Sequence, residues 1–207
     1  TRMRPLTERH PKPLLPLGDS TLIERTMSQC VDVVDRFVIV VGYRGDDIRA
    51  AIGDTFDGVP VEYVTQPEPL GTAHAIGQAA DAVSGRFLVL NGDVVIDESL
   101  PRQLADTDGT AIAVRTVENP SAYGVVETDG DIVADLIEKP ADPPSDLINT
   151  GIYAFTDDIF EFIERTEVSS RGEYEITDSI DHMLADGHRV EAVDYDGVWR
   201  DIGRPWE

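Results

Sequence analysis

The feature that most constrains the fold is a continuous apolar run, Phe37-Val38-Ile39-Val40-Val41, which ends at Gly42. Consecutive apolar residues without polar alternation are typical of a strand that is buried on both faces of a parallel sheet. A helical pattern precedes this run, because apolar residues keep helical spacing from residue 20 onward and Thr21 with Glu24 fits a capping box. The sequence therefore predicts a helix followed by a buried parallel strand.

Strands and helices continue to alternate up to about residue 109. The expected elements are a helix over 46–52, a strand over 59–65, a helix over 72–83 and a strand over 86–90. Strand-like runs with almost no helix between them follow at 111–116, 124–128, 132–137 and 148–155. Helices over 158–165 and 174–186 then precede a strand over 189–195. This order predicts an α/β fold whose sheet has a mixed or antiparallel extension.

Composition excludes several classes of protein. The 207 residues have a formal net charge of −23, and 41% of them are hydrophobic, which is too apolar for a disordered acidic chain. Such a charge repels polyanions, so we expect no nucleic-acid partner. No apolar run approaches the ~20 residues of a membrane span and no leader opens the chain, so we expect no membrane partner. A single cysteine, Cys30, cannot form an internal disulfide, which favours a cytoplasmic location.

Cationic residues are scarce, and nearly all of them are arginines. Of 17 Lys+Arg, set against 40 Asp+Glu, only Lys12 and Lys139 are lysines. A very acidic, lysine-poor surface resembles the proteins of salt-loving archaea, so we interpret the charge as adaptation to salt rather than as a partner-binding surface. Arg2, Arg4 and Lys12 gather in the first twelve residues. They could form a solvated basic terminus, but the prolines on both sides of Lys12 favour a site that holds a polyanion.

A second candidate site is the turn from Gln66 to Ala75, which leads into a helix. Thr72 alone fits a helix N-cap. Gln66, however, offers the donor and acceptor that recognition of a base edge requires, and Gly71 would let a flat ring approach the backbone. His74 has no partner at metal-ligand spacing, so we expect it to pack or to lie on the helix surface.

Two carboxylates are candidate metal ligands. Asp93 follows the apolar strand over 86–90, at the edge of a sheet where ligands bind, and Asp201 lies in Trp199-Arg200-Asp201. One or two carboxylates with substrate phosphates suit Mg²⁺. A structural turn is the competing interpretation for each. The second half of the chain contains residues that could form hydrogen bonds with sugar hydroxyls or bind an anion. Each of them also fits a structural role in a turn or a cap. They are Gly124, Glu138, Lys139, Asn149, Thr150 and Tyr153.

Taken in this order, the motifs resemble those of the sugar-1-phosphate nucleotidylyltransferases, of the glucose-1-phosphate thymidylyltransferase or N-acetylglucosamine-1-phosphate uridylyltransferase type. In that family a strand and a loop, Gly-x-Gly-Thr-Arg, precede Pro-Leu-Thr and Lys-Pro-Leu-Leu-Pro, which Thr1–Thr7 and Lys12–Pro16 match here. The resemblance covers essentially the whole chain. It implies a mixed, mostly parallel Rossmann-like nucleotidyltransferase sheet flanked by helices, with the first strand missing. It also divides residues 1–207 into a base and triphosphate half over about 1–109 and a sugar-phosphate half over about 110–207.

The same resemblance implies roles for the candidate residues. Arg2 and Lys12 would act on the phosphates, Gln66, Gly71 and Thr72 would hold the base, and Asp93 and Asp201 would bind Mg²⁺. Lys139 would take the sugar phosphate, and the sugar would contact Gly124, Glu138, Asn149, Thr150 and Tyr153. The implied reaction is in-line attack by a sugar-1-phosphate on the α-phosphorus of UTP or dTTP, with release of pyrophosphate.

Several alternatives stay open. A non-catalytic nucleotide-sugar-binding module of the same fold is the main one, although it would be expected to lose Lys12, Asp93 or Asp201. A glycosyltransferase usually carries an Asp-x-Asp pair, whereas this chain has Asn91-Gly92-Asp93. The sugar, the choice between UTP and dTTP, and the question of a homo-oligomer are undecided. We expect truncation at both ends, because archaeal relatives typically continue into a trimeric left-handed β-helix.

Overall fold

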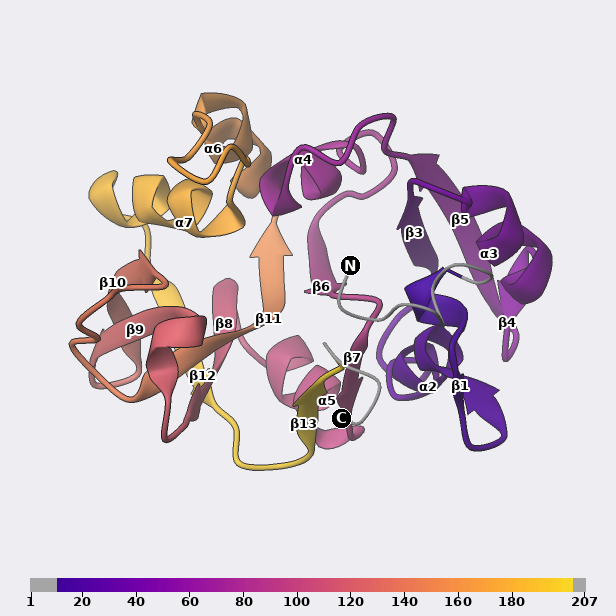
Figure 1. Ribbon diagram of the computed structural model, residues 1–207, viewed down its shortest axis with the longest axis horizontal. Coiled ribbons are helices and arrows are strands. Elements are labelled where there is room, and N and C mark those ends of the chain that lie inside the picture. Colours follow the sequence, from indigo (N-terminus) through magenta and orange to yellow (C-terminus); the bar gives the residue numbers. More distant parts are fainter. Residues whose placement is uncertain (1–10, 203–207) are drawn as a thin grey trace.

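The computed structural model describes residues 11–202, and Figure 1 shows how their elements are arranged. The helices are η1 (Lys12–Leu14), α2 (Leu22–Ser28), α3 (Gly45–Ile52), α4 (Thr72–Gly77), α5 (Ser99–Ala105), η2 (Pro120–Ala122), α6 (Ile159–Arg165) and α7 (Ile176–Ala185). The strands of the first half are β1 (Pro16–Leu17), β2 (Ser20–Thr21), β3 (Phe37–Val41), β4 (Thr55–Phe56), β5 (Val59–Thr65), β6 (Arg86–Leu90) and β7 (Val94–Ile96). Those of the second half are β8 (Thr110–Thr116), β9 (Gly124–Asp129), β10 (Ile132–Glu138), β11 (Leu147–Thr156), β12 (Val190–Asp194) and β13 (Trp199–Asp201).

The largest sheet among the described residues has the strand order β6-β11-β8-β12-β10-β9. Strands β6 and β8 both pair antiparallel with β11, and β12 pairs parallel with β8. Hence β6, β8 and β12 run in one direction and β11 runs against them. The β9–β10 hairpin continues the sheet with antiparallel pairing. The sheet is therefore mixed, as the sequence predicts.

Two apolar cores lie on opposite faces of this sheet, because successive side chains of a strand point to opposite sides. On one face, helices α4, α6 and α7 cover Ile112 and Val114 of β8 (Figure 1). On the other face, α5, β7 and β13 cover Ala111 and Ala113 of the same strand. These strand residues are at most 1% exposed, which explains why residues 111–114 of β8 are apolar without interruption.

A smaller sheet, β3-β5-β4, packs with α2 and α3 around a third core that includes Met27, Val41 and Ile48. Strands β3 and β5 pair in parallel, and α3 lies between them in the chain. The capping box that begins α2 is confirmed: the Thr21 hydroxyl accepts a hydrogen bond from the Glu24 N–H, and the Glu24 carboxylate accepts one from the Thr21 N–H at 2.7 Å.

A cavity of about 1260 Å³ separates the two sheets. Its walls are β3 and β6 with parts of α2 and α4. Within residues 11–202, β3 pairs only with β5, and β6 pairs only with β11, so each has an unpaired edge. Both strands are half-exposed for most of their length although they are apolar, since the cavity lies beside them.

The expected boundaries differ from the structure mainly in two helices. The helical spacing that begins at residue 20 extends to Val34, whereas α2 ends at Ser28. The prediction of a helix over 72–83 is too long, because α4 ends at Gly77. After it, Ala79 and Ala80 donate to the carbonyls of Ile76 and Gly77, three residues earlier, so the chain tightens into turns. The short elements β7, α5 and β13 were not predicted. None of the helices in the described part of the chain is long and apolar enough to cross a membrane.

Candidate active site

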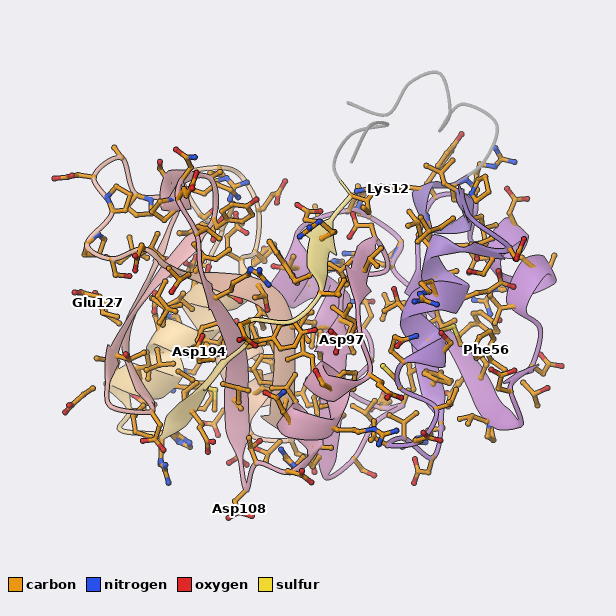
Figure 2. The ribbon with its side chains drawn as sticks, turned by 90° about the horizontal axis from the view of Figure 1, so that it is seen from below. Lys12, Phe56, Asp97, Asp108, Glu127 and Asp194 are labelled. Carbon is orange, nitrogen blue, oxygen red and sulfur yellow. The ribbon has the colours of Figure 1, made fainter. Side chains whose placement is uncertain are left out.

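The structure joins Lys12 and Asp93 in an ion pair, although they lie 81 residues apart in the sequence. Lys12 begins η1 between two prolines, and Asp93 lies in the turn between β6 and β7. The two side chains keep 25% and 30% of their surface exposed, so a ligand can reach both. Figure 2 shows Lys12 on the side of the molecule where β13 lies. The predicted phosphate-binding lysine and a predicted metal ligand are thus neighbours.

The pairing of β13 with β7 brings the backbone of Asp201 close to that of Asp93. Strands β13 and β7 are antiparallel, and Asp201 lies opposite Val94, the residue that follows Asp93. The Ile202 N–H donates to the Asp93 carbonyl at 3.2 Å. The described residues contain no group of three or more His, Cys, Asp or Glu that could hold a metal by itself. The backbones of Asp93 and Asp201 are neighbours. One or two carboxylates fit Mg²⁺ when substrate phosphates complete its coordination.

The predicted base-binding residues line the loop from β5 to α4. The Gln66 side-chain amide lies 2.9 Å from the His74 ring nitrogen Nδ1 and donates to the Gly71 carbonyl at 3.4 Å. Gly71 has φ +124°, and a Cβ there would lie 2.6 Å from the backbone nitrogen of Tyr174, so only glycine fits. His74 contacts Gln66 and lies beside the Tyr174 ring, in agreement with a packing role.

Thr72 does not cap the helix that it begins. The N-cap of α4 is Gly71, and the Thr72 hydroxyl instead accepts a hydrogen bond from the N–H of Ile176, at 3.0 Å. Ile176 is the first residue of α7. Thr72 therefore caps a helix far along the chain and connects the base-side loop to the segment that begins α7.

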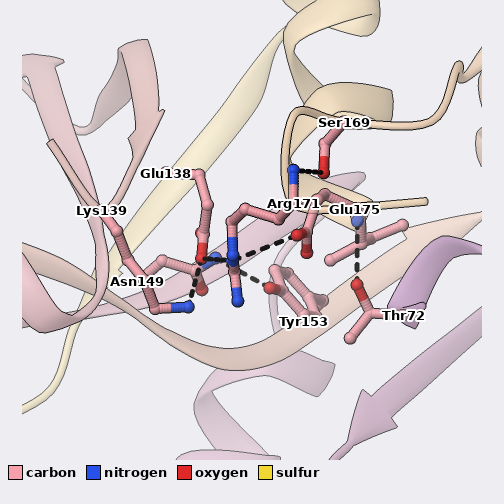
Figure 3. A network of polar contacts seen from close by, with 9 residues as sticks. Thr72, Glu138, Lys139, Asn149, Tyr153, Ser169, Arg171 and Glu175 are labelled. Atoms are coloured by element: carbon pink, nitrogen blue, oxygen red, sulfur yellow. Dashed lines mark hydrogen bonds and ion pairs between the residues drawn. The ribbon is translucent and has the colours of Figure 1, made fainter. Parts of the chain in front are cut away.

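A polar network lies on the sugar-phosphate side (Figure 3). One Glu138 oxygen accepts from Lys139 Nζ at 2.6 Å and from Arg171 Nη1 at 2.8 Å. The same guanidinium nitrogen forms an ion pair with Glu175 at 3.1 Å. Two carboxylates and two cations are thus held together. Gly124 lies against Glu138, since a Cβ at this glycine would be 3.2 Å from Glu138 Oε2.

Asn149 and Tyr153 form the buried end of this side. The Asn149 amide donates to the Tyr153 hydroxyl at 2.8 Å, and burial raises the pKa of Tyr153. The side chain of Thr150 is not part of the network. It donates to the Ala113 carbonyl at 2.8 Å, and its own carbonyl accepts from the Trp199 indole at 3.2 Å.

Arg171 and Glu175 were missed by the sequence analysis. Glu175 is buried, and burial raises its pKa while Arg171 lowers it. The scarcity of cations is the available signal for Arg171, but it was applied only to Arg2, Arg4 and the two lysines. Arg2 and Arg4, which were predicted to contact phosphates, lie outside the described residues.

The cavity between β3 and β6 reaches close to both groups. Pro13, next to Lys12, and Asn91 and Gly92, which precede Asp93, line one part of it. Thr72 and Tyr153 line another part. The described charged residues of the two groups do not line it.

Known proteins are similar to this chain over its whole length. A family model described as nucleotidyl transferase matches residues 1–206. The bifunctional protein GlmU of Methanocaldococcus jannaschii is 39% identical over 208 residues, covering all of this chain and 49% of the relative. The UTP–glucose-1-phosphate uridylyltransferase AglF of Haloferax volcanii is 37% identical over 213 residues, covering 99% of this chain and 88% of the relative.

Solved structures show the same fold. A Bacillus anthracis protein described as a glucose-1-phosphate thymidylyltransferase, in complex with sucrose, has a TM-score of 0.88 and 27% identity. The match covers 99% of this chain and 86% of that one. A UDP-glucose pyrophosphorylase with bound UDP-glucose has a TM-score of 0.82 and 25% identity, with 98% and 89% coverage. The chain spans about half the length of the first GlmU relatives that it matches.

Proposed function

The chain belongs to the nucleotidyl transferase family, and on this premise we propose that it transfers a nucleotidyl group from UTP or dTTP to a sugar-1-phosphate. Glucose-1-phosphate and N-acetylglucosamine-1-phosphate are the proposed acceptors, and pyrophosphate is the second product. The observation that carries this proposal is the meeting of Lys12 with Asp93, next to the backbone of Asp201, in a chain of this family.

The proposed reaction needs no protein nucleophile. A phosphate oxygen of the sugar-1-phosphate attacks the α-phosphorus, a new P–O bond forms, and the bond to the pyrophosphate leaving group breaks. Lys12 would neutralise charge that builds on the α-phosphate, and Arg2 is proposed to contact the triphosphate. Positioning and charge stabilisation supply most of the acceleration in such transfers.

Asp93 and Asp201 are the proposed ligands of Mg²⁺, which would shield the triphosphate charge when bound. Their neighbouring backbones and the exposure of Asp93 fit this role. Lys12 pairs with Asp93 in the structure. When substrate and cation bind, this ion pair would open, and Asp93 would bind the cation instead. Lys12 is then free to bind phosphate.

On the acceptor side, Lys139 and Arg171 are proposed to bind the sugar phosphate. Glu138 holds both cations at one oxygen and keeps them in place before the anion arrives. Glu138, Asn149 and the backbone at Gly124 would contact sugar hydroxyls, with Tyr153 behind Asn149. Thr150 would contribute only through its backbone, because its hydroxyl is bonded to Ala113. Gln66, Gly71 and Thr72 are proposed to hold the base.

Pyrophosphate release tests the proposal. The assay uses molar potassium chloride, because the net charge of −23 suggests a salt-adapted cytoplasmic protein, and Mg²⁺ with UTP or dTTP. Each nucleotide is paired with glucose-1-phosphate or N-acetylglucosamine-1-phosphate. Release that requires both substrates supports the enzyme and ranks the pairs.

A chain with a restored glycine-rich opening is assayed in parallel. Release from that chain alone supports the activity and shows that the opening is needed. No release from either, together with binding of a nucleotide sugar, contradicts the enzyme and supports the non-catalytic module.

A further inference from the structure

A separate polar cluster joins the two segments that carry Asp93 and Asp201. Asp97 directly follows β7, and one of its carboxylate oxygens accepts from the Tyr195 hydroxyl at 2.7 Å and from the Val198 N–H at 2.9 Å. The other oxygen accepts from the N–H and the hydroxyl of Ser99, at 2.9 and 2.5 Å. Oδ1 therefore holds the turn after β7 through Ser99, and Oδ2 holds the connection from β12 to β13 through Tyr195 and Val198.

Tyr195 is itself fixed to the central sheet. It is only 2% exposed, and its N–H donates to the Val114 carbonyl of β8 at 2.9 Å. The chain then wraps closely round the ring, because a Cβ at Gly197 would lie 2.6 Å from the ring carbons Cε2 and Cζ. Arg115 donates to the Gly197 carbonyl at 2.7 Å. The carboxylate of Asp97 thus connects β7 to a firmly anchored segment.

Within residues 11–202, the pairing of β7 with β13 comprises three residue pairs, from Trp199 opposite Ile96 to Asp201 opposite Val94. A slip of one residue would move β13 by about 3.3 Å and turn its side chains to the other face. Such a short ladder specifies its register weakly. The hydrogen bond from Val198, the residue before β13, to Asp97 fixes the starting point of that ladder.

We propose that Asp97 and Tyr195 are positioning residues that set the register of β13 on β7 and thereby hold Asp201 beside Asp93. The inference rests on the proposed function, because it assigns a purpose to this register: it brings together the backbones of the two carboxylates that are proposed to bind one divalent cation. Neither Asp97 nor Tyr195 touches the substrate or the cation.

Three variants separate the two halves of the cluster. Asp97→Asn leaves one acceptor oxygen where two are needed, and Tyr195→Phe removes only the hydroxyl. Ser99→Ala is the matched control, because it removes a donor to the same carboxylate on the turn side and leaves Val198 and Tyr195 in place. Circular dichroism identifies any variant that fails to fold.

Two measurements are made on each chain without turnover. Electron paramagnetic resonance of Mn²⁺, with UTP present, gives the dissociation constant of the cation. Hydrogen exchange of the Ile202 amide, which donates to the Asp93 carbonyl, reports the register directly. We expect Asp97→Asn to weaken Mn²⁺ binding about tenfold or more, with faster exchange at Ile202. Tyr195→Phe should give a smaller change in the same direction, and Ser99→Ala should give none.

Pyrophosphate release adds a kinetic readout. The Mg²⁺ concentration for half-maximal rate should rise in Asp97→Asn, and saturating Mg²⁺ should restore most of the parental kcat. If Mn²⁺ affinity is unchanged in Asp97→Asn, the inference is wrong whether or not the Ile202 amide exchanges faster. The proposed function is not contradicted by that result. Absence of Mn²⁺ binding in the parent chain contradicts the metal pair of the proposed function and the inference with it.

Discussion

The hydroxyl of Thr72 accepts a hydrogen bond from the backbone N–H of Ile176, 104 residues further along the chain. The bond connects the start of α4 to the start of α7, and Ala73 N–H, which donates to the Tyr174 carbonyl at 3.0 Å, supports the same junction. Glu175 lies between these contacts and pairs with Arg171. The base-side loop and the sugar-phosphate side therefore share one junction.

Loss of the Thr72 hydroxyl should loosen this junction. Thr72→Val keeps the shape of the side chain but cannot accept from Ile176, so we expect a loss of about 0.5–2 kcal/mol in the free energy of unfolding, as for other helix caps. Urea unfolding measures it. Thr72→Ser retains the acceptor and should stay near the parental value; equal losses in both variants would contradict a capping role.

Lys12 and Asp93 are expected to control turnover rather than folding. Removal of a single charge-stabilising contact typically costs about 2.7–4 kcal/mol of barrier, so Lys12→Ala or Asp93→Asn should lower kcat by two or more orders of magnitude. Steady-state pyrophosphate release measures the rate, and circular dichroism confirms the fold. Arg165→Gln, which breaks a surface ion pair with Asp186, is the control and should leave kcat unchanged. A Lys12→Ala chain that retains most activity would argue against the assignment.

Arg171 should govern affinity for the sugar phosphate. Arg171→Gln removes a charged donor of a kind that contributes about 1.5–3 kcal/mol, so the KM for the sugar-1-phosphate should rise roughly tenfold to a hundredfold. The KM for the nucleotide should change little. Arg171→Lys keeps the charge near Glu175, so its KM for the sugar-1-phosphate should lie between those of the parent chain and Arg171→Gln. Arg189→Gln breaks an exposed ion pair with Asp131 elsewhere and should have no effect. Equal changes in both KM values would contradict the prediction.

Asp181 of α7 should make stability depend on pH. Burial, followed by the charges of Asp135 on β10 and Asp178 on α7, raises its pKa from 3.8 to about 7. Between these values the folded chain binds more protons at this site than the unfolded chain, so stability falls as pH rises through this interval. Asp181→Asn removes the effect, and its stability relative to the parent chain should be higher at pH 8 than at pH 5. Thermal unfolding at fixed salt measures it, with Asp108→Asn, on an exposed loop, as control.

The long elements were predictable because one physical signal determines each. The apolar run Phe37–Val41 predicts β3 residue for residue, although only Val41 of this strand is buried because the cavity lies beside it. The capping box at Thr21 and Glu24 is likewise local, since both partners lie within one turn. Such signals need no knowledge of distant parts of the chain.

The missed elements depend on contacts across long stretches of sequence. Strands β7 and β13 have three residues each, too few to show a periodicity, and their pairing joins residues about one hundred positions apart. The bonding partner of Thr72 and the meeting of Arg171 with Glu138 are also set by tertiary packing. The sequence indicated the candidate residues on the phosphate side, but not the cluster that holds Asp201 beside Asp93.

The gap between β3 and β6 has a consequence for how copies of the chain behave toward one another. Unpaired strand edges are templates on which another chain can add a strand. In the part of the chain that the structure describes, β3 and β6 each have such an apolar edge at the same cavity. The net charge of −23 keeps copies apart only within the range of electrostatic repulsion, about 3 Å in 1 M salt. In concentrated salt, a strand that fills the gap would therefore also protect the protein against aggregation.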